Sequence, residues 1–300
     1  MFFARCCVFC QMANEMVFKP GIFVLLIKHK RMKTVLVTGA SSGIGKATAV
    51  YLAQNGYKVY GAARRTEKLE ELKTLGVIPI SMDVTNEESL SRCVERIMKE
   101  AGGIDILVNN AGSGYYGALE DMPMSDARYQ MEVNVFAVAR LIQLVLPGMR
   151  KNKYGKIINI SSIGGKVTLP MGVWYHASKF AIEGLSDALR KEVKSFGIDV
   201  VVIEPGGTRS EMTGLGTGYL SRISGDTVYS HLAKGVSKMY AATEKGAADP
   251  IVIAKLIKKG IEAKCPKTRY AGASGAKPML FLRKILSDKM FDRMVMSQMK

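Results

Sequence analysis

The sequence of 300 residues has few of the side chains that hold disulfides or metals, with five cysteines and three histidines. Cys6, Cys7 and Cys10 crowd the N-terminus, whereas Cys93 and Cys265 stand far apart. Because this spacing is not that of a disulfide framework, we expect a reducing, cytoplasmic compartment. No second Cys/His pair lies near the CCVFC stretch, so we expect no metal site.

Long apolar runs are also lacking near the N-terminus. The run over residues 21–27 is too short to span a bilayer. Its stronger basic cluster, residues 28–31, follows it, whereas a secretory signal places basic residues first. The stretch MKTVLVTGASSGIG, beginning at Met32, has the form of a natural start. We therefore expect residues 1–31 to be an extension outside the fold; a weak membrane anchor is the alternative.

Acidic residues are scarce, because 26 Asp and Glu stand against 43 Lys and Arg and give a formal charge of +17. The excess lies at the two ends, with a net charge of +4 over residues 1–31 and +9 over residues 251–300. A nucleic-acid binder more typically carries a basic stripe with a reading motif. The sequence contains no such motif, so we expect no nucleic-acid partner.

What the sequence does have is an alternation of apolar strands and helices. We expect strands over residues 34–39, 57–63, 77–83, 104–112, 155–162, 198–207 and 268–272. We expect helices over residues 44–55, 67–75 (capped by Thr66), 87–100, 125–146 (ending near Pro147), 174–196 and 250–262. This alternation predicts an α/β domain over residues 32–273, with a Rossmann-type, doubly wound parallel sheet of about seven strands and helices on both faces.

A glycine-rich turn, TGASSGIG at residues 38–45, lies between the first strand and its helix. Gly39, Gly43 and Gly45 suit a turn where backbone approaches a ligand closely. The free N–H groups of the following helix then face a pyrophosphate. A tight structural turn is the alternative, but the flanking strand and helix favour a dinucleotide site.

The second strand ends at GAARRTE, with no acidic residue before Glu67. An acid at this place binds the ribose hydroxyls of NAD, whereas an arginine accommodates the 2′-phosphate of NADP. Arg64, followed by Arg65, therefore predicts NADP(H) in preference to NAD(H). The alternative is that both arginines are solvated surface charges.

These motifs combine with others in one order along the chain. They are TGASSGIG at 38–45, the pair Asp83 and Val84, NNAG at 109–112, Asn134, INISS ending at Ser162, YHASK at 175–179 and EPGGTRS at 204–210. From about Met32 to Ala273 the chain resembles the short-chain dehydrogenase/reductases. It is similar to their retinol and 17β-hydroxysteroid dehydrogenase types and to uncharacterised bacterial oxidoreductases.

The resemblance implies a catalytic set of Asn134, Ser162, Tyr175 and Lys179. Tyr175 and Lys179 are four residues apart, so they share a helix face, although that spacing alone also fits an ordinary solvated face. A nearby ammonium lowers the pKa of a phenol, which would let Tyr175 act as general acid and base. Ser162 would donate a hydrogen bond to the substrate oxygen, and Asn134 would hold a water.

The resemblance also implies the rest of the cofactor site, with Asn109, Ala111 and Gly112 along the cofactor's ribose and the centre of the sheet. Together with the glycine turn and Arg64, the expected cofactor-binding residues are Gly39, Ser41, Ser42, Gly43, Ile44, Gly45, Arg64, Asp83, Val84, Asn110, Ala111, Gly112, Tyr175, Lys179, Pro205, Gly206, Thr208 and Ser210. Ser210 stands where the family often has threonine. We therefore expect an enzyme, with a non-catalytic NADP(H)-binding regulator as the alternative.

The substrate side is expected in a lid over residues 208–246. Apolar and aromatic candidates for its wall are Tyr115, Met171, Trp174, Met212, Leu215 and Tyr219, although each also fits plain core packing. They favour a lipophilic carbonyl or alcohol. Residues 274–300 form a basic amphipathic tail that we expect to pack on the lid or on a partner subunit, in a homodimer or homotetramer, rather than on an anionic membrane.

Overall fold

Apolar, β-branched runs form a seven-stranded parallel sheet in the computed structural model, which describes residues 31–299. The strands are β1 Thr34–Thr38, β2 Lys58–Ala63, β3 Val77–Ser81, β4 Ile106–Asn109, β5 Gly155–Ile160, β6 Ile198–Pro205 and β7 Arg269–Gly272. Their order is β3-β2-β1-β4-β5-β6-β7. The predicted doubly wound sheet is therefore confirmed. We expected residues 1–31 to be an extension outside the fold. Except for Arg31, these residues lie outside the described range.

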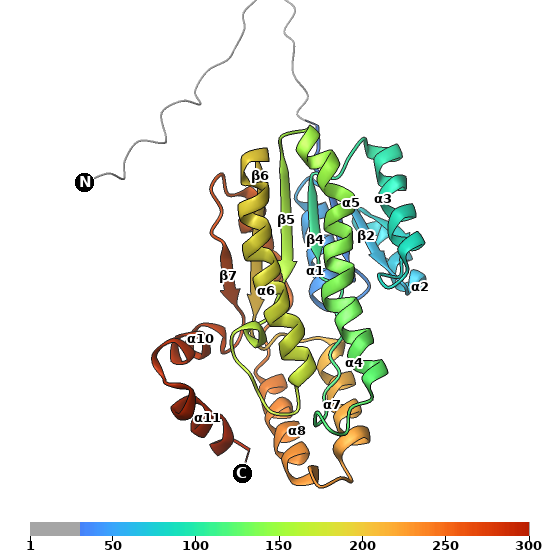
Figure 1. The fold of residues 1–300 in the computed structure, drawn as a ribbon. Coiled ribbons are helices and arrows are strands. Elements are labelled where there is room, and N and C mark those ends of the chain that lie inside the picture. Colours follow the sequence, from blue (N-terminus) through green and yellow to red (C-terminus); the bar gives the residue numbers. More distant parts are fainter. Residues whose placement is uncertain (1–30, 300) are drawn as a thin grey trace, which may run out of the picture. The chain divides into compact units, whose positions relative to one another are not determined.

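Helices cover both faces of the sheet (Figure 1). One face packs on α1 Gly43–Gln54, α2 Thr66–Glu70 and α9 Ile251–Glu262. The other packs on α3 Glu87–Ala101, α5 Ala137–Lys151 and α6 Val173–Val193. All seven strands are parallel, so their carboxyl ends meet at one edge, where a doubly wound sheet binds its ligands.

Four further helices lie beyond that edge (Figure 1). They are α7 Glu211–Ser224, α8 Ser230–Lys245, α10 Ala276–Ile285 and α11 Asp288–Ser297. Phe291 and Val295 of α11 are buried in one apolar cluster with Tyr116 and Tyr175. The tail helices thus pack on the part of the molecule that carries the expected catalytic tyrosine.

The helix that contains Pro147 differs from the prediction. Helix α4, Met124–Met131, continues through a π-helical turn, Glu132–Phe136, into α5, which runs past Pro147 to Lys151. Pro147 is exposed, so the carbonyl that its missing N–H leaves unpaired faces water. The helix therefore ends at Lys151, five residues beyond the expected end at residue 146.

Two other local features complete the comparison with the predicted elements. Thr66 is the first residue of α2 rather than its cap, and its helix ends at Glu70 before a short 3-10 turn over Lys73–Leu75. Within the described range, Met124–Lys151 is the one helix long and apolar enough to cross a membrane. Its Leu141, Ile142 and Val145 are buried against the sheet, so core packing accounts for its apolar character.

Candidate functional site

The glycine turn after β1 is shaped by close backbone contacts. Gly39 and Gly43 have φ angles of +66° and +52°, which suit glycine. A Cβ on Gly45 would lie 2.2 Å from the Gly39 carbonyl oxygen, so helix α1 packs on the turn only because Gly45 has no side chain. A turn without side chains at these positions suits the close approach of a pyrophosphate to a helix N-terminus.

The turn is tied to the NNAG motif that follows β4. Thr38 Oγ1 accepts hydrogen bonds from the backbone N–H groups of Asn110 and Ala111, at 3.0 and 2.9 Å. Asn110 Nδ2 donates to the Thr38 carbonyl at 2.9 Å. Asn109 instead donates to Asn159 Oδ1 inside the sheet, at 2.9 Å. Hydrogen bonds therefore hold the two motifs together. Asn110 rather than Asn109 lines the cavity described next.

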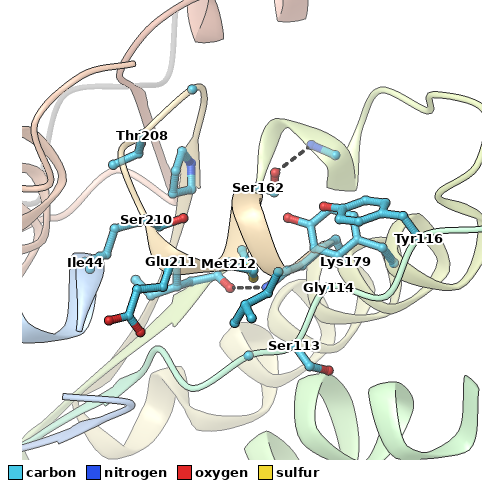
Figure 2. A pocket seen from close by; sticks show the side chains of 18 of the residues that line it. Ile44, Ser113, Gly114, Tyr116, Ser162, Lys179, Thr208, Ser210, Glu211 and Met212 are labelled. Atoms are coloured by element: carbon cyan, nitrogen blue, oxygen red, sulfur yellow. Dashed lines mark hydrogen bonds between the residues drawn. The ribbon is translucent and has the colours of Figure 1, made fainter. Parts of the chain in front are cut away.

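A cavity of about 980 Å³ extends from this turn to Tyr175 and on to the tail helices. Figure 2 shows Ser162, Lys179 and Tyr116 on one side of it, and Ile44, Ser210 and Glu211 on the other. The predicted residues that line it are Gly39, Ser41, Ser42, Gly43, Ile44, Arg64, Val84, Asn110, Ala111, Gly112, Tyr115, Ser162, Tyr175, Lys179, Pro205, Gly206, Thr208, Ser210, Met212, Leu215 and Tyr219.

Besides Asn109, five predicted residues do not line the cavity. Gly45 packs beneath the turn, and Asp83 Oδ1 accepts hydrogen bonds from the backbone and hydroxyl of its neighbour Thr85, at 2.9 and 2.8 Å. Met171 has a positive φ of 65° and is buried behind Tyr175. Trp174 packs on the cluster of Met122, Ala127 and Tyr219. Asn134 is the fifth, and it lies behind the reacting residues.

Asn134 sits in the π-helical turn between α4 and α5. Its Oδ1 accepts from Ser113 N at 2.8 Å, and its Nδ2 donates to the Ser113 carbonyl at 3.0 Å and to Ser178 Oγ at 2.9 Å. The amide is therefore fully used within the protein. It fixes the cavity-lining residue Ser113 to the helix that carries Tyr175 and Lys179.

Arg65 lies closer to the glycine turn than Arg64 does. Its guanidinium donates to Ser41 Oγ at 3.0 Å, to Ser42 Oγ at 2.9 Å and to Glu211 at 2.8 Å. Arg64 donates to Tyr129 Oη at 2.8 Å. Both arginines line the cavity. Arg64 alone was predicted to bind the cofactor, and in the sequence only the paired serines of the turn point to Arg65.

Tyr175 and Lys179 face one space from the first turns of α6. The Lys179 ammonium donates to the Ile160 carbonyl at 3.0 Å and lies 5.9 Å from the centre of the Tyr175 ring. Ser162 Oγ accepts from Gly164 N at 3.0 Å. Tyr116 packs on Tyr175 with ring centres 5.4 Å apart. The expected trio is therefore brought together on one wall of the cavity, with Tyr175 and Lys179 buried.

Burial dominates the electrostatics of this trio. It raises the pKa of Tyr175 above 10.0, against the lowering effect of a hydrogen bond with Ser162. Burial also lowers the pKa of Lys179 to about 8, opposed by the nearby Glu183 carboxylate. Burial accounts for the raised pKa of Tyr175, and the lowering of that pKa by the Lys179 ammonium stays a prediction.

His176 was left out of the predicted site, and the structure gives it a structural position beside the site. Its Nε2 accepts from Leu169 N at 3.0 Å, so Nδ1 carries the proton and donates to the Gly164 carbonyl at 2.9 Å. Burial lowers the pKa of His176. The neutral ring thus fastens the loop between Ser162 and Tyr175.

The wall of the cavity opposite the glycine turn, which we call the far wall, is formed by residues that were not predicted to line the site. Tyr240 and Met239 come from α8, Met279 from α10, and Met294, Val295 and Gln298 from α11 or the residues just after it. Their apolar character continues that of Tyr115 and Met212. In the described part of the chain, no group of three or more His, Cys, Asp or Glu could hold a metal ion.

The fold and the site together define a dinucleotide-dependent oxidoreductase. Residues 33–216 match the family model described as short chain dehydrogenase, and the chain belongs to this family. It is 36% identical over 84% of its length to an uncharacterised oxidoreductase, YusZ, of Bacillus subtilis, covering 93% of that protein. It is 34% identical over 90% of its length to an NADPH-dependent 3-dehydrocapnine reductase of Ornithobacterium rhinotracheale, covering 98% of that protein.

A higher identity extends over a shorter stretch. The chain is 47% identical to a 3-ketodihydrosphingosine reductase of Bacteroides thetaiotaomicron over 57% of its own length and 62% of that protein. Among solved structures, a short-chain dehydrogenase of Streptomyces avermitilis shares 31% identity with a TM-score of 0.74, covering 88% of this chain and 95% of that one. The fold binds NAD(P), and members of the family act on small molecules and commonly oligomerise.

Proposed function

We propose that the protein is an NADPH-dependent reductase that converts a lipophilic ketone or aldehyde to its alcohol, with Tyr175 as the proton donor. The observation that carries the proposal is the meeting of Ser162 with the buried Tyr175 and Lys179 on one wall of the cavity that begins at the glycine turn. A strand-to-helix turn that fits a dinucleotide and a buried phenol that holds its proton are the two parts such a reduction needs.

A nicotinamide cofactor held at the glycine turn and Arg64 would supply the hydride to the carbonyl carbon, and the electron pair of the C=O π bond would then move to the oxygen. Tyr175 donates its hydroxyl proton to that oxygen. Because burial raises the pKa of Tyr175, the phenol stays protonated at neutral pH and is ready to donate. Lys179, held by the Ile160 carbonyl, stabilises the phenolate that remains.

Ser162 polarises the substrate. Its Oγ accepts a hydrogen bond from Gly164 N, and its hydroxyl proton, which points to the Tyr175 oxygen in this structure, donates to the carbonyl oxygen when the substrate binds. That bond strengthens as negative charge grows on the oxygen. Asn134 acts indirectly, because it anchors Ser113 and Ser178.

The preference for NADPH rests on Arg64 and Arg65. Both guanidinium groups line the cavity at the end of β2, and no acidic side chain lies on that stretch to repel a phosphate. The reductase of Ornithobacterium rhinotracheale that covers most of this chain is named NADPH-dependent, which supports the assignment.

The apolar far wall favours a substrate with a lipophilic body over a sugar phosphate. Two relatives are named for the reduction of 3-ketodihydrosphingosine and of 3-dehydrocapnine. A ketone carried on a lipid is therefore the first substrate class to assay, ahead of retinoids and steroids. We place the enzyme in the cytoplasm as a homodimer or homotetramer.

Turnover across a panel of aldehydes, ketones, retinoids, steroids and keto-lipids, each with NADPH and with NADH, tests the proposal. We expect reduction of at least one lipophilic ketone and a higher kcat/KM with NADPH. A non-catalytic NADPH-binding regulator is the competing function. Tight NADPH binding without turnover of any compound would favour the regulator and contradict the proposed reductase.

A further inference from the structure

A second apolar groove lies on the outside of the site, between α6 and α11. Its volume is about 640 Å³. Val173, Ala177 and Phe180 of α6 line one side, and Val295 and Met296 of α11 line the other. Val173, Phe180 and Met296 are 45%, 44% and 44% exposed. These side chains offer apolar surface to a ligand rather than filling the core.

The groove lies against the reaction cavity and shares part of its wall. Leu169, His176 and Val295 line both. Val295 and Leu169 belong to the apolar cluster that contains Tyr175. The wall between the groove and the proton donor is therefore one side chain thick in places, and most of it is apolar.

The shared wall offers few polar groups to a ligand. His176 is the polar member, and both of its ring nitrogens are already bonded, to Leu169 N and to the Gly164 carbonyl. Among the residues that line the groove, only Thr168 and Asp292 carry other polar side chains. A hydrocarbon chain suits such a lining, whereas a second polar head group would lose its hydration without replacement.

We propose that this groove holds the alkyl chain of the substrate, so that the enzyme reduces a ketone on a long unbranched chain that passes between Leu169 and Val295. The inference rests on the proposed reductase function. Helix α11 is then a specificity element, because it supplies Val295 and Met296 to the groove and Met294 to the cavity.

The test is a homologous series of methyl ketones from butanone to dodecanone, assayed with NADPH. Each methylene that enters the groove is expected to raise kcat/KM about fourfold, which corresponds to about 0.8 kcal/mol. Ala177→Phe fills the groove from α6 and is expected to lower the kcat/KM ratio of dodecanone to butanone at least about tenfold. Ala188→Phe, the same change at an exposed position on the same helix, keeps the wild-type ratio.

Binding is measured in parallel through the fluorescence of Trp174, the one tryptophan of the sequence. Dodecanone is expected to change this fluorescence in the wild type and in Ala188→Phe, and to bind Ala177→Phe more weakly. Val173→Phe replaces Ala177→Phe should the latter fail to give a wild-type melting curve.

The outcomes separate the two proposals. Chain-selective dodecanone binding without any turnover would retain the groove and contradict the reductase. Turnover that does not depend on chain length, or that depends on it equally in Ala177→Phe, would retain the reductase and overturn the groove. A change of oligomer size in Ala177→Phe with an unchanged ketone ratio would make the groove an interface between copies, and would also overturn it.

Discussion

Replacing Arg64 and Arg65 by alanine, singly and together, tests which cofactor the site prefers. A hydrogen bond to a charged group contributes about 1.5–3 kcal/mol. Arg65 is 41% exposed, so solvent screens it and the lower value applies. Arg65 must also leave Glu211, to which it donates at 2.8 Å, before it binds a phosphate. We therefore expect each single variant to weaken NADPH binding about tenfold, and the double variant about a hundredfold.

The assay is titration of NADPH and of NADH into each variant. NADH lacks the 2′-phosphate, so its dissociation constant is expected to change less than about threefold. Lys68→Ala is the matched control, because Lys68 also donates to Glu211, at 2.8 Å, but does not line the cavity. Equal weakening of both cofactors, or an effect of Lys68→Ala as large as that of Arg65→Ala, would refute the reasoning.

Three further predictions concern stability. Gly45→Ala places a Cβ against the Gly39 carbonyl, so we expect it to lower the free energy of unfolding by about 2 kcal/mol or more and to abolish NADPH binding. Gly184→Ala on α6 is the control, because a Cβ there meets nothing within 4 Å, and we expect it to raise the free energy of unfolding by up to about 1 kcal/mol. Chemical denaturation measures both changes. Burial raises the pKa of Glu204 to about 7, so the native state holds a proton that the unfolded chain releases, and stability falls as pH rises from 4.5 towards 7. The stability of Glu204→Gln relative to the wild type should therefore rise by about 2 kcal/mol between about pH 5 and about pH 8, and no rise would contradict the raised pKa. Burial lowers the pKa of His176 from 6.5, so the unfolded chain takes up that proton first and native stability declines as pH falls below 6.5; His176→Phe should remove this decline in pH-stepped melts.

The strands and the order of the motifs could be predicted because each depends on local sequence. TVLVT at β1 is a continuous apolar run of the kind that a parallel sheet buries on both faces. The helix expected over residues 174–196 ends where predicted, because Gly197, with a φ of +72°, closes the last 3-10 turn after α6. Such signals need no knowledge of distant residues.

The features that escaped prediction depend on contacts between distant segments. Pro147 stays within α5 because that face of the helix meets water, which its own sequence does not reveal. Arg65 contacts the glycine turn and also donates to Glu211, which is far from Arg65 along the chain. The contribution of α11 to the cavity wall likewise arises only when the tail packs near Tyr175.

The central claim is that Tyr175 donates the proton in carbonyl reduction, and Tyr175→Phe tests it most directly. The change removes one oxygen atom and keeps the ring that packs on Tyr116. We expect kcat for the best ketone to fall about a hundredfold or more, with the melting curve and the NADPH dissociation constant unchanged. Full turnover by a folded, NADPH-binding Tyr175→Phe enzyme would contradict the account.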